Sequence, residues 1–530
     1  MCVNQEGRRG KNMDLSREVS RTQVLVEVSR LRLKTIYREK SAEAIVGNHK
    51  KEKVAEGLNN VTMQTNVCTC GYPTADVGET YMSRKRENIG LTAGSGKERS
   101  TQSMSELLEK ILDNRNMNEA YKKVCANKGA GGVDGMELEE LDGYIRENWN
   151  SIREQIRERS YKPQPVRRVE IPKPNGSKRK LGIPTVMDRV IQQGIAQVIS
   201  PMCEPLFSEN SYGFRPNRSC EMAVREMLIF LNGGYEWIVD IDLEKFFDNV
   251  PQDKLMSLVH NIINDGDTES LIRKYLKAGV MVQGRYEKTD RGTPQGGNLS
   301  PLLSNIMLNE LDKELEKRGL RFVRYADDCV IAVRSEASAK RVMYSITDWI
   351  QRKLGLKVNA EKTRITRPGR LKYLGFGFYK DSKAKEWKCR PHRDSVEKFK
   401  RTLKKLTNRS QSMAFAVRVQ RLNWVIRGWI NYFALGSMKT VMNDVDAHLR
   451  TRLRVIIWKK WKVPKKRQWG LQKLGIGKDL ARQTSYMGDH YQWVVTKTCV
   501  VRAISKEKLS QAGLVSCYDY YLEHHALKLC

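Results

Sequence analysis

The chain has 530 residues, and its hydrophobic content of 40% is enough for a globular protein of several domains. Its 95 lysine and arginine residues outnumber 61 aspartate and glutamate residues, which gives a net charge of +34. This excess argues against an ordinary small-metabolite enzyme and favours a polyanionic partner, nucleic acid before an acidic membrane. Apolar runs of 18 residues are absent, so we expect no membrane-spanning segment and no membrane partner.

The positive charge is concentrated at the C-terminal end. Residues 380–530 hold 33 basic and 11 acidic residues, a net charge of +22, whereas residues 1–103 and 104–379 each carry +6. We therefore expect salt-dependent phosphate binding to be strongest in the C-terminal third. Residues 1–103 contain no motif, and the close pair Cys68 and Cys70 lacks the C-x-x-C spacing of a zinc site. The eleven scattered cysteines and the missing apolar signal segment indicate a reducing cytoplasm.

The organised part of the chain begins at Met104. Residues 105–112 and 117–125 predict amphipathic helices, and a Gly-rich loop follows at residues 129–135. Residues 169–184 predict a β-hairpin, because two short strands flank a Pro-Asn-Gly turn. Its arms are basic and suit phosphate binding, although a solvated hairpin has the same composition.

Two predicted strand segments carry paired acids. On the apolar strand W-I-V-D-I-D-L, Asp240 and Asp242 share one face because side chains alternate along a strand. Residues 322–332 predict a hairpin with Asp327 and Asp328 at its tip. Adjacent carboxylates repel each other, and a divalent metal ion is the simplest compensation. An isolated D-x-D at an exposed strand end would need no such partner.

The remaining motifs are a loop, a strand and basic or aromatic helical segments. A Gly/Pro loop enters a helix at residues 292–303, and a short strand with a glycine break follows at residues 371–378. Residues 395–406 predict a helix with one apolar and one basic face, which suits a nucleic-acid backbone. The aromatic residues within 424–433 are expected mainly in the core. Residues 450–469 combine dense positive charge with three tryptophans, a composition typical of RNA binding and also of a solvated face.

The order of these motifs resembles a reverse transcriptase: a basic hairpin, a D-I-D-L strand, a T-P-Q-G-G loop, a Y-A-D-D hairpin and an L-G-F-G-F strand. Three further motifs, G-G-V-D-G-M, Y-G-F-R-P-N-R (residues 212–218) and R-G-W-I-N-Y-F (residues 427–433), are similar to the reverse transcriptase/maturases encoded by group II introns. The resemblance runs from about Met104 to the C-terminus and is greatest to the compact bacterial class C proteins. We expect this chain, like those, to lack an H-N-H endonuclease domain, since no C-terminal Cys/His cluster is present.

The resemblance implies an α+β fold. We expect a right-hand polymerase with fingers and an antiparallel palm sheet, then an α-helical thumb/maturase domain and a basic C-terminal DNA-binding region. The expected segments are a poorly organised extension at 1–103, the N-terminal extension and fingers at 104–235, the palm at 236–379, the thumb/maturase domain at 380–455 and the nucleic-acid-binding region at 456–530.

The resemblance also implies phosphoryl transfer with two Mg²⁺ ions, for which Mn²⁺ is a possible substitute. The expected metal ligands are three catalytic carboxylates and one carbonyl, those of Asp242, Asp327, Asp328 and Leu243. We choose Asp242 rather than Asp240 because the family's catalytic aspartate precedes an aromatic residue, here Phe247, by five positions.

Four residues are expected to bind the incoming dNTP, namely Lys173, Arg179, Phe247 and Gln295. By the resemblance, Lys173 and Arg179 clamp the triphosphate from the two hairpin arms, and Gln295 lines the nucleotide pocket. Phe247 would lie beneath the sugar and exclude its 2′-OH, unless it is an ordinary core residue.

Tyr325 and Gly375 are expected to support the active site and the primer end, although a structural role suits Tyr325 equally well. Eight basic residues are expected to contact RNA or DNA, namely Lys398, Lys404, Arg450, Arg454, Lys459, Lys460, Lys465 and Lys466. The implied partners are group II intron RNA, an RNA template/DNA primer duplex, target DNA and dNTPs.

The implied function is an RNA-directed DNA polymerase that also binds its intron RNA as a maturase and assists splicing and retrohoming. We expect it in the bacterial cytoplasm, and at the nucleoid when it is bound to DNA. Two alternatives stay open: a host-adopted reverse transcriptase in repair or phage defence, and a catalytically idle splicing cofactor. The maturase-like region argues against the first, and the intact acids argue against the second. An RNA-dependent RNA polymerase would need a small or polar residue in place of Phe247.

Overall fold

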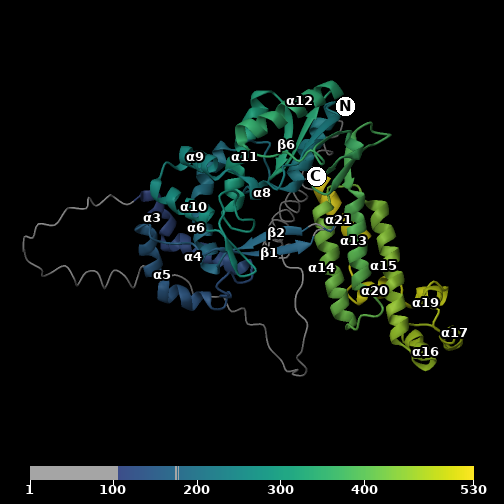
Figure 1. Cartoon of the computed structure of the whole chain (residues 1–530). Coiled ribbons are helices and arrows are strands. Elements are labelled where there is room, and N and C mark those ends of the chain that lie inside the picture. Colours follow the sequence, from purple (N-terminus) through teal and green to yellow (C-terminus); the bar gives the residue numbers. More distant parts are fainter. Residues whose placement is uncertain (1–104, 173–175, 177, 530) are drawn as a thin grey trace, which may run out of the picture. The chain divides into compact units, whose positions relative to one another are not determined.

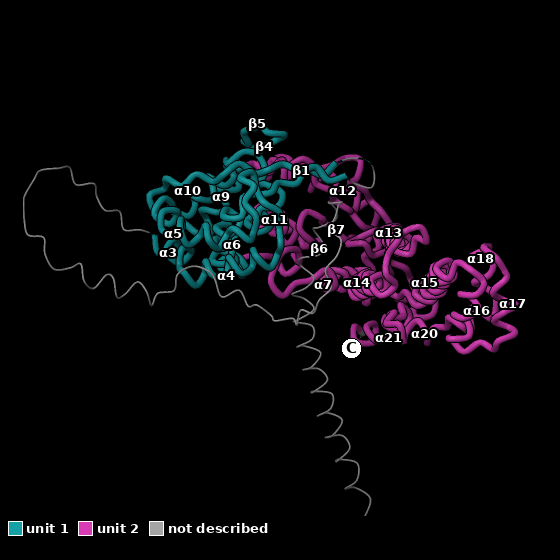
Figure 2. Tube along the Cα trace, turned by 90° about the horizontal axis from the view of Figure 1, so that it is seen from below, with its two compact units in different colours: residues 1–205, 252–303 teal, residues 206–251, 304–530 magenta. Residues whose placement is uncertain are grey.

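The computed structural model describes residues 105–172, 176 and 178–529 (Figure 1). The extension expected at residues 1–103 lies outside these residues, and so does Lys173. The chain divides into two compact units (Figure 2). Of the described residues, unit 1 contains those up to Pro205 and Gln252–Leu303, and unit 2 contains Leu206–Pro251 and those from Ser304 onward.

Unit 1 combines helices with a four-stranded sheet. The helices are α3 (Glu106–Leu112), α4 (Asn114–Ala126), α5 (Leu141–Arg157), α6 (Val186–Cys203), α9 (Gln252–Ile263) and α10 (Gly266–Lys277). The sheet has the order β2-β1-β4-β5, with β1 (Val166–Pro172), β2 (Lys178–Ile183), β4 (Val280–Val282) and β5 (Arg285–Glu287). Ser105 and Asp113 cap α3 and α4, because their side-chain oxygens accept from free backbone N–H groups of the first turn. The two predicted helices and the predicted β1–β2 hairpin are confirmed.

Unit 2 contains the sheet expected for a palm. Its strand order is β6-β7-β3-β8, and every neighbouring pair is antiparallel. The strands are β3 (Trp237–Ile241), β6 (Arg321–Tyr325), β7 (Asp328–Val333) and β8 (Arg364–Thr366). Cys329 to Val333 are all buried on β7, so the middle of the sheet is apolar and its polar residues gather at the strand ends. The predicted antiparallel palm sheet is therefore confirmed.

Several helices surround the four-stranded sheet of unit 2 or connect its strands. They are η2 (Glu204–Leu206), α7 (Cys220–Asn232), α8 (Phe246–Asn249), α11 (Ser300–Lys317), α12 (Glu336–Trp349), η3 (Ile350–Leu354) and η4 (Pro368–Arg370). Helix α12 packs on β3, β7 and β8, and α7 packs on β6. These helices shield the apolar strands from water.

A second, three-stranded sheet of unit 2 has the order β11-β10-β9 and leads into a helical region (Figure 1). Its strands are β9 (Lys372–Tyr373), β10 (Phe376–Lys380) and β11 (Trp387–Pro391). The long helices are α13 (Arg393–Leu406), α14 (Phe415–Phe433), α15 (Lys439–Lys460) and α21 (Cys517–Leu529). The shorter ones are α16 (Pro464–Lys473), α17 (Lys478–Ser485), α18 (Tyr491–Val494), α19 (Thr498–Ala503) and α20 (Lys506–Gln511).

One buried cluster of apolar side chains joins the strands of unit 2 to its C-terminal helices. It includes Val330 of β7, Phe376 of β10, Ile426 of α14, Leu449 of α15 and Tyr521 of α21. Because one apolar core is shared, the C-terminal helices and the strands of unit 2 stabilise each other. The expected α+β class with a helical C-terminal region is confirmed.

None of the helices that the structure describes is long and apolar enough to cross a membrane. The cysteines in the described part of the chain are free thiols.

Candidate active site

The Tyr-Ala-Asp-Asp segment forms the tip of the β6–β7 hairpin. Tyr325 pairs with Asp328, so Ala326 and Asp327 make a two-residue loop. Ala326 has a φ of 56°, a left-handed conformation that a residue with a Cβ adopts only at a cost. The hairpin predicted from the sequence is confirmed, and its strained loop needs support from the surrounding structure.

A buried arginine supports this loop through a hydrogen bond. Arg324 is wholly buried, and its Nη1 donates to the carbonyl of Ala326 at 3.0 Å. The same guanidinium donates through Nε to Oδ1 of buried Asp312 at 2.7 Å. The backbone N–H of Tyr212 donates to the carbonyl of Arg324 at 2.9 Å. A Cβ on Gly213 would lie 2.2 Å from the nitrogen of Ala326, so only glycine fits there. This contact gives the Y-G-F-R-P-N-R motif a structural role next to the Tyr-Ala-Asp-Asp loop.

Asp240 on β3 and Asp242 just after it each face a cation. Lys362 Nζ lies 3.1 Å from Oδ1 of Asp242 and 3.2 Å from Oδ2. Arg364 Nε lies 3.5 Å from Asp240, its register partner on β8. Asp240 and Asp242 therefore share one face, as strand alternation predicts. The sequence interpretation missed Lys362 and Arg364, whose spacing of two mirrors that of the acids.

The carboxylates at this end of the sheet repel one another. Asp328 keeps an exposed surface, yet neighbouring protein atoms displace part of its hydration. This desolvation, together with the negative charges of Asp327, Asp240 and Asp242, raises the pKa of Asp328 to about 6. Burial likewise raises the pKa of Asp240. The site thus holds more negative charge than its neighbouring cations compensate, and carboxylate oxygens are the donors that Mg²⁺ prefers. These residues fit a divalent cation.

The described residues contain no ready-made cluster of three or more His, Cys, Asp or Glu side chains around a metal position. In this conformation the carboxylate of Asp242 is bound to the amine of Lys362. The amine of Lys362 is therefore the cation with which a metal ion at Asp242 would compete.

Two of the residues expected to bind dNTP are brought together in unit 1. Arg179 Nε donates to Oε1 of Gln295 at 3.3 Å, and the N–H of Gly182 donates to the carbonyl of Gln295 at 2.6 Å. The T-P-Q-G-G loop is thus fastened to strand β2. Lys173 lies outside the described residues.

Leu243 and Phe247 belong to unit 2, next to Asp242. Leu243 forms an isolated bridge with Val358, and Phe247 is buried with its ring edge against Phe246. The burial of Phe247 agrees with a core role and with a platform beneath a sugar, so its function stays a prediction.

Gly375 lies in the turn between β9 and β10, with a φ of 80°. The turn contacts helices α13 and α14, because a Cβ on Gly375 would lie 3.2 Å from both Ser395 Oγ and Phe433 Cζ. Trp429 and Phe433 pack in the core as predicted, whereas Trp424 and Tyr432 are exposed at 55% and 44%.

The basic residues expected to bind nucleic acid differ in how far their side chains are exposed. Five are exposed, namely Lys398, Lys404, Lys460, Lys465 and Lys466. Arg450 and Lys459 are half-buried. Arg454 departs from the prediction: it is buried between α15 and α19, and its Nε donates to the carbonyl of Ile504 at 2.9 Å. Arg454 is therefore a structural residue and not part of a phosphate-binding surface.

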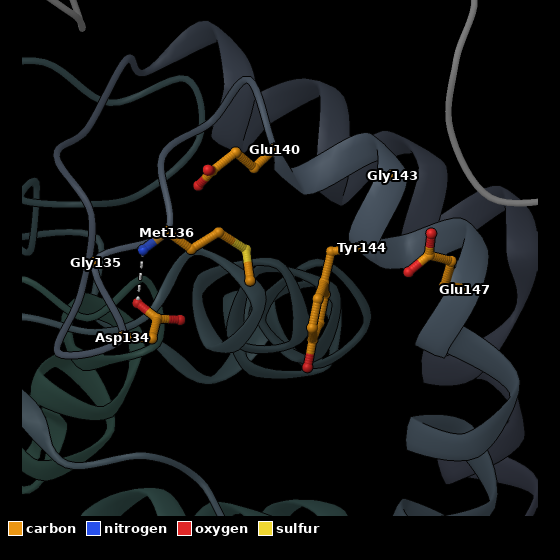
Figure 3. Close-up of a pocket in the computed structure, with 7 residues that line it drawn as sticks. All are labelled: Asp134, Gly135, Met136, Glu140, Gly143, Tyr144 and Glu147. Atoms are coloured by element: carbon orange, nitrogen blue, oxygen red, sulfur yellow. Dashed lines mark hydrogen bonds between the residues drawn. The ribbon is translucent and has the colours of Figure 1, made fainter.

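A pocket of about 500 Å³ lies in unit 1, and its lining includes none of the residues expected at the active site (Figure 3). Its lining comes from the Gly-rich loop and α5: Asp134, Gly135, Met136, Glu140, Gly143, Tyr144 and Glu147. Its charged side chains are acidic, so it does not suit a nucleic-acid phosphate.

Comparisons with known proteins identify the family of the chain. Residues 171–378 match the family model "Reverse transcriptase (RNA-dependent DNA polymerase)", and residues 396–475 match "Group II intron, maturase-specific domain". The fold and the paired acids therefore define a reverse transcriptase, a class that requires a divalent metal ion. More specifically, the chain belongs to the family of group II intron-encoded reverse transcriptase/maturases.

Three relatives illustrate this membership. The chain is 33% identical over 323 residues to "Group II intron-encoded protein LtrA" of Lactococcus lactis subsp. cremoris, covering 48% of this chain and 54% of that protein. It is 33% identical over 299 residues to "Protein YkfC" of Escherichia coli K12, covering 49% and 78%. It is 29% identical to "Putative COX1/OXI3 intron 2 protein" of Saccharomyces cerevisiae, covering 54% and 40%. The chain thus spans about half the length of the first of these relatives.

Proposed function

We propose that this chain is an RNA-directed DNA polymerase that also binds its group II intron RNA as a maturase, assisting splicing and retrohoming. The observation that carries the proposal is the antiparallel pairing of β3 with β7, which brings the end of β3, with Asp240 and Asp242, beside the Asp327–Asp328 tip of the hairpin. This pairing occurs in a chain that matches both the reverse transcriptase and the maturase models.

In the proposed polymerase, Asp242, Asp327 and Asp328 hold two Mg²⁺ ions, with Mn²⁺ as substitute and the Leu243 carbonyl as a further ligand. Bound metal ions supply charge stabilisation during phosphoryl transfer. Asp242 suits this role better than Asp240, because it follows the last residue of β3 and its partner is a flexible lysine. Asp240 lies within the strand, opposite Arg364.

The other proposed roles are those that membership of the family implies. Arg179, with Lys173, binds the triphosphate, and Gln295 lines the nucleotide pocket. Phe247 excludes the 2′-OH, so deoxynucleotides are selected. Tyr325 and Gly375 support the primer end.

The maturase half of the proposal concerns the helical region. We propose that the exposed lysines of α13 and of the segment from Lys460 to Lys466 bind RNA and target DNA. The net charge of +22 in residues 380–530 supports this assignment, since nucleic-acid affinity comes largely from phosphate contacts. We also propose that the protein works in the cytoplasm, and at the nucleoid when bound to DNA; the free thiols in the described part of the chain are consistent with a reducing compartment.

The maturase half is tested by splicing of the intron precursor RNA in vitro, with and without the full chain, at a low Mg²⁺ concentration. We expect faster splicing with the wild type and also with Asp327→Ala, since the RNA performs the splicing chemistry. Lys465→Gln/Lys466→Gln should weaken RNA binding and lower the salt slope by about one per lost phosphate contact. Splicing that is unchanged by the wild-type protein would contradict the maturase role.

A further inference from the structure

We propose that Tyr432, a residue of the maturase-specific domain, positions the primer end for DNA synthesis by hydrogen-bonding the turn between β9 and β10. This inference rests on the polymerase function proposed above. It adds a positioning residue that lies outside the segment matched by the reverse transcriptase model, which ends at residue 378.

The β9–β10 turn has an unusual backbone. Tyr373 pairs with Phe376, so Leu374 and Gly375 are the two central residues. Their φ angles are 48° and 80°, and a turn with two positive φ angles normally takes Asn, Asp or Gly at both positions. Leucine at the first position is strained, so contacts from outside the hairpin must hold the turn in this conformation.

Those contacts come from helix α14 and from the start of helix α13. The hydroxyl of Tyr432 on α14 donates to the carbonyl of Leu374 at 3.0 Å. The carbonyl of Gly375 accepts from Ser395 Oγ at 2.9 Å and from the N–H of His392 at 2.9 Å. Both carbonyls of the strained turn are therefore bound by groups outside the hairpin.

Aromatic packing fixes the ring of Tyr432 in place. The Tyr432 ring stacks on Phe376, the residue after the turn, with centroids 5.9 Å apart. Phe433 packs against the same Phe376 ring at 4.9 Å and against Trp429 at 4.7 Å. Trp429 in turn stacks on Phe399 of α13 at 4.4 Å. The R-G-W-I-N-Y-F motif thus supplies a column of rings that joins the thumb helices to β10.

The Tyr432 hydroxyl also lies within electrostatic reach of the catalytic hairpin. Desolvation raises the pKa of Tyr432, and the neighbouring Cys220, Tyr325 and Asp328 raise it further. The hydroxyl therefore stays protonated and acts as a donor over the working pH range. The strand before the turn is also tied directly to this hairpin, because the hydroxyl of Tyr373 on β9 donates to the carbonyl of Val323 on β6 at 3.5 Å. A turn held in one conformation beside the hairpin would keep a primer 3′-OH ordered.

The test compares wild type, Tyr432→Phe and Tyr486→Phe as full chains. Tyr432→Phe keeps the ring and removes only the donor, while Tyr486→Phe makes the same change at an exposed tyrosine of the C-terminal region. The measurements are kcat and KM for dTTP on poly(rA) with an oligo(dT) primer, intron RNA binding and the melting temperature. Ser395→Ala, which removes the donor to Gly375, is a second variant.

We expect Tyr432→Phe to lower kcat about 3- to 10-fold, the range for one lost hydrogen bond, with KM for dTTP changed less than about twofold. Ser395→Ala should act in the same direction, while RNA binding stays as in the wild type and the melting temperature falls only by the small amount expected for one lost hydrogen bond. An active wild type with an equally active Tyr432→Phe would overturn this inference alone. A Tyr432→Phe variant that loses RNA binding and melts at a much lower temperature along with its loss in kcat would also overturn it, because general destabilisation would then explain the lower activity. A wild type that incorporates no dTTP would overturn the polymerase function and this inference with it.

Discussion

Arg324 and Asp312 form an ion pair that is wholly buried beneath the catalytic loop, and the same guanidinium donates to the carbonyl of Ala326. One residue thus combines a charge partner in the core with a hydrogen bond to the strained position beside Asp327. This relationship joins the stability of unit 2 to the shape of its active site.

Removing one member of the pair should lower the free energy of unfolding more than removing both. Asp312→Leu leaves a buried, unpaired guanidinium, which costs about 3–5 kcal/mol of the free energy of unfolding. Arg324→Met/Asp312→Leu should recover much of this loss, because no buried charge remains. The double variant should still polymerise poorly, because Ala326 has lost its donor. Urea denaturation and dTTP incorporation measure the two effects, and a double variant as unstable as Asp312→Leu would contradict the account.

Stability of the metal-free protein should depend on Asp328 in a defined pH window. Its pKa in the folded protein is about 6, above the value of 3.8 expected for an unfolded chain. Between these values the folded state binds more protons than the unfolded state, so the contribution of Asp328 to stability falls as pH rises from about 4 to 6. Melting temperatures measured with EDTA across this range should show the decline in wild type and a smaller one in Asp328→Asn. Equal slopes in the two proteins would show that another group is responsible.

Lys362 should compete with metal for Asp242. Lys362→Met removes the amine that faces the carboxylate, and the remaining acids then attract a cation more strongly. An exposed ion pair is worth up to about 1 kcal/mol, so we expect Mn²⁺ to bind about 2- to 5-fold more tightly. Electron paramagnetic resonance of free Mn²⁺ measures this directly. Lys340→Met removes the same charge from α12 and should leave affinity unchanged; an equal gain there would indicate only a change in net charge.

Gly213 should be essential for polymerisation but not for RNA binding. Alanine at this position places a Cβ 2.2 Å from the backbone nitrogen of Ala326, so the catalytic loop must shift. We expect Gly213→Ala to lose at least about tenfold in kcat, since misplacement by about 1 Å is enough for a loss of this size or larger. The matched change Gly428→Ala, in open space on α14, should be neutral or slightly stabilising. Primer extension that is equal in both variants would refute this role of Gly213.

Local patterns predicted the elements that carry the acids. The alternation around Asp240 and Asp242, and the two apolar strands around Asp327 and Asp328, are properties of short segments, and both strands and the hairpin were found as expected. Burial of Trp429 and Phe433 also followed from helical spacing.

The remaining features depend on tertiary contacts that no short segment reveals. Lys362 meets Asp242 only because β8 pairs with β3, 120 residues away along the chain. Arg454 belongs to a basic run in the sequence. On α15, however, it lies on the buried side of the helix, between buried Leu453 and Val455. The bond from Tyr432 to Leu374 joins a helix and a turn that are separated by 58 residues.

The most direct test of the central claim is Mg²⁺-dependent incorporation of dTTP on poly(rA) with an oligo(dT) primer, measured for wild type and Asp327→Ala. The account predicts clear incorporation by the wild type and a fall to background in the variant, with both proteins folded and binding RNA equally. Incorporation that persists in Asp327→Ala would contradict the assignment of the metal site. A folded wild type that binds RNA tightly but incorporates no dTTP would contradict the polymerase function itself.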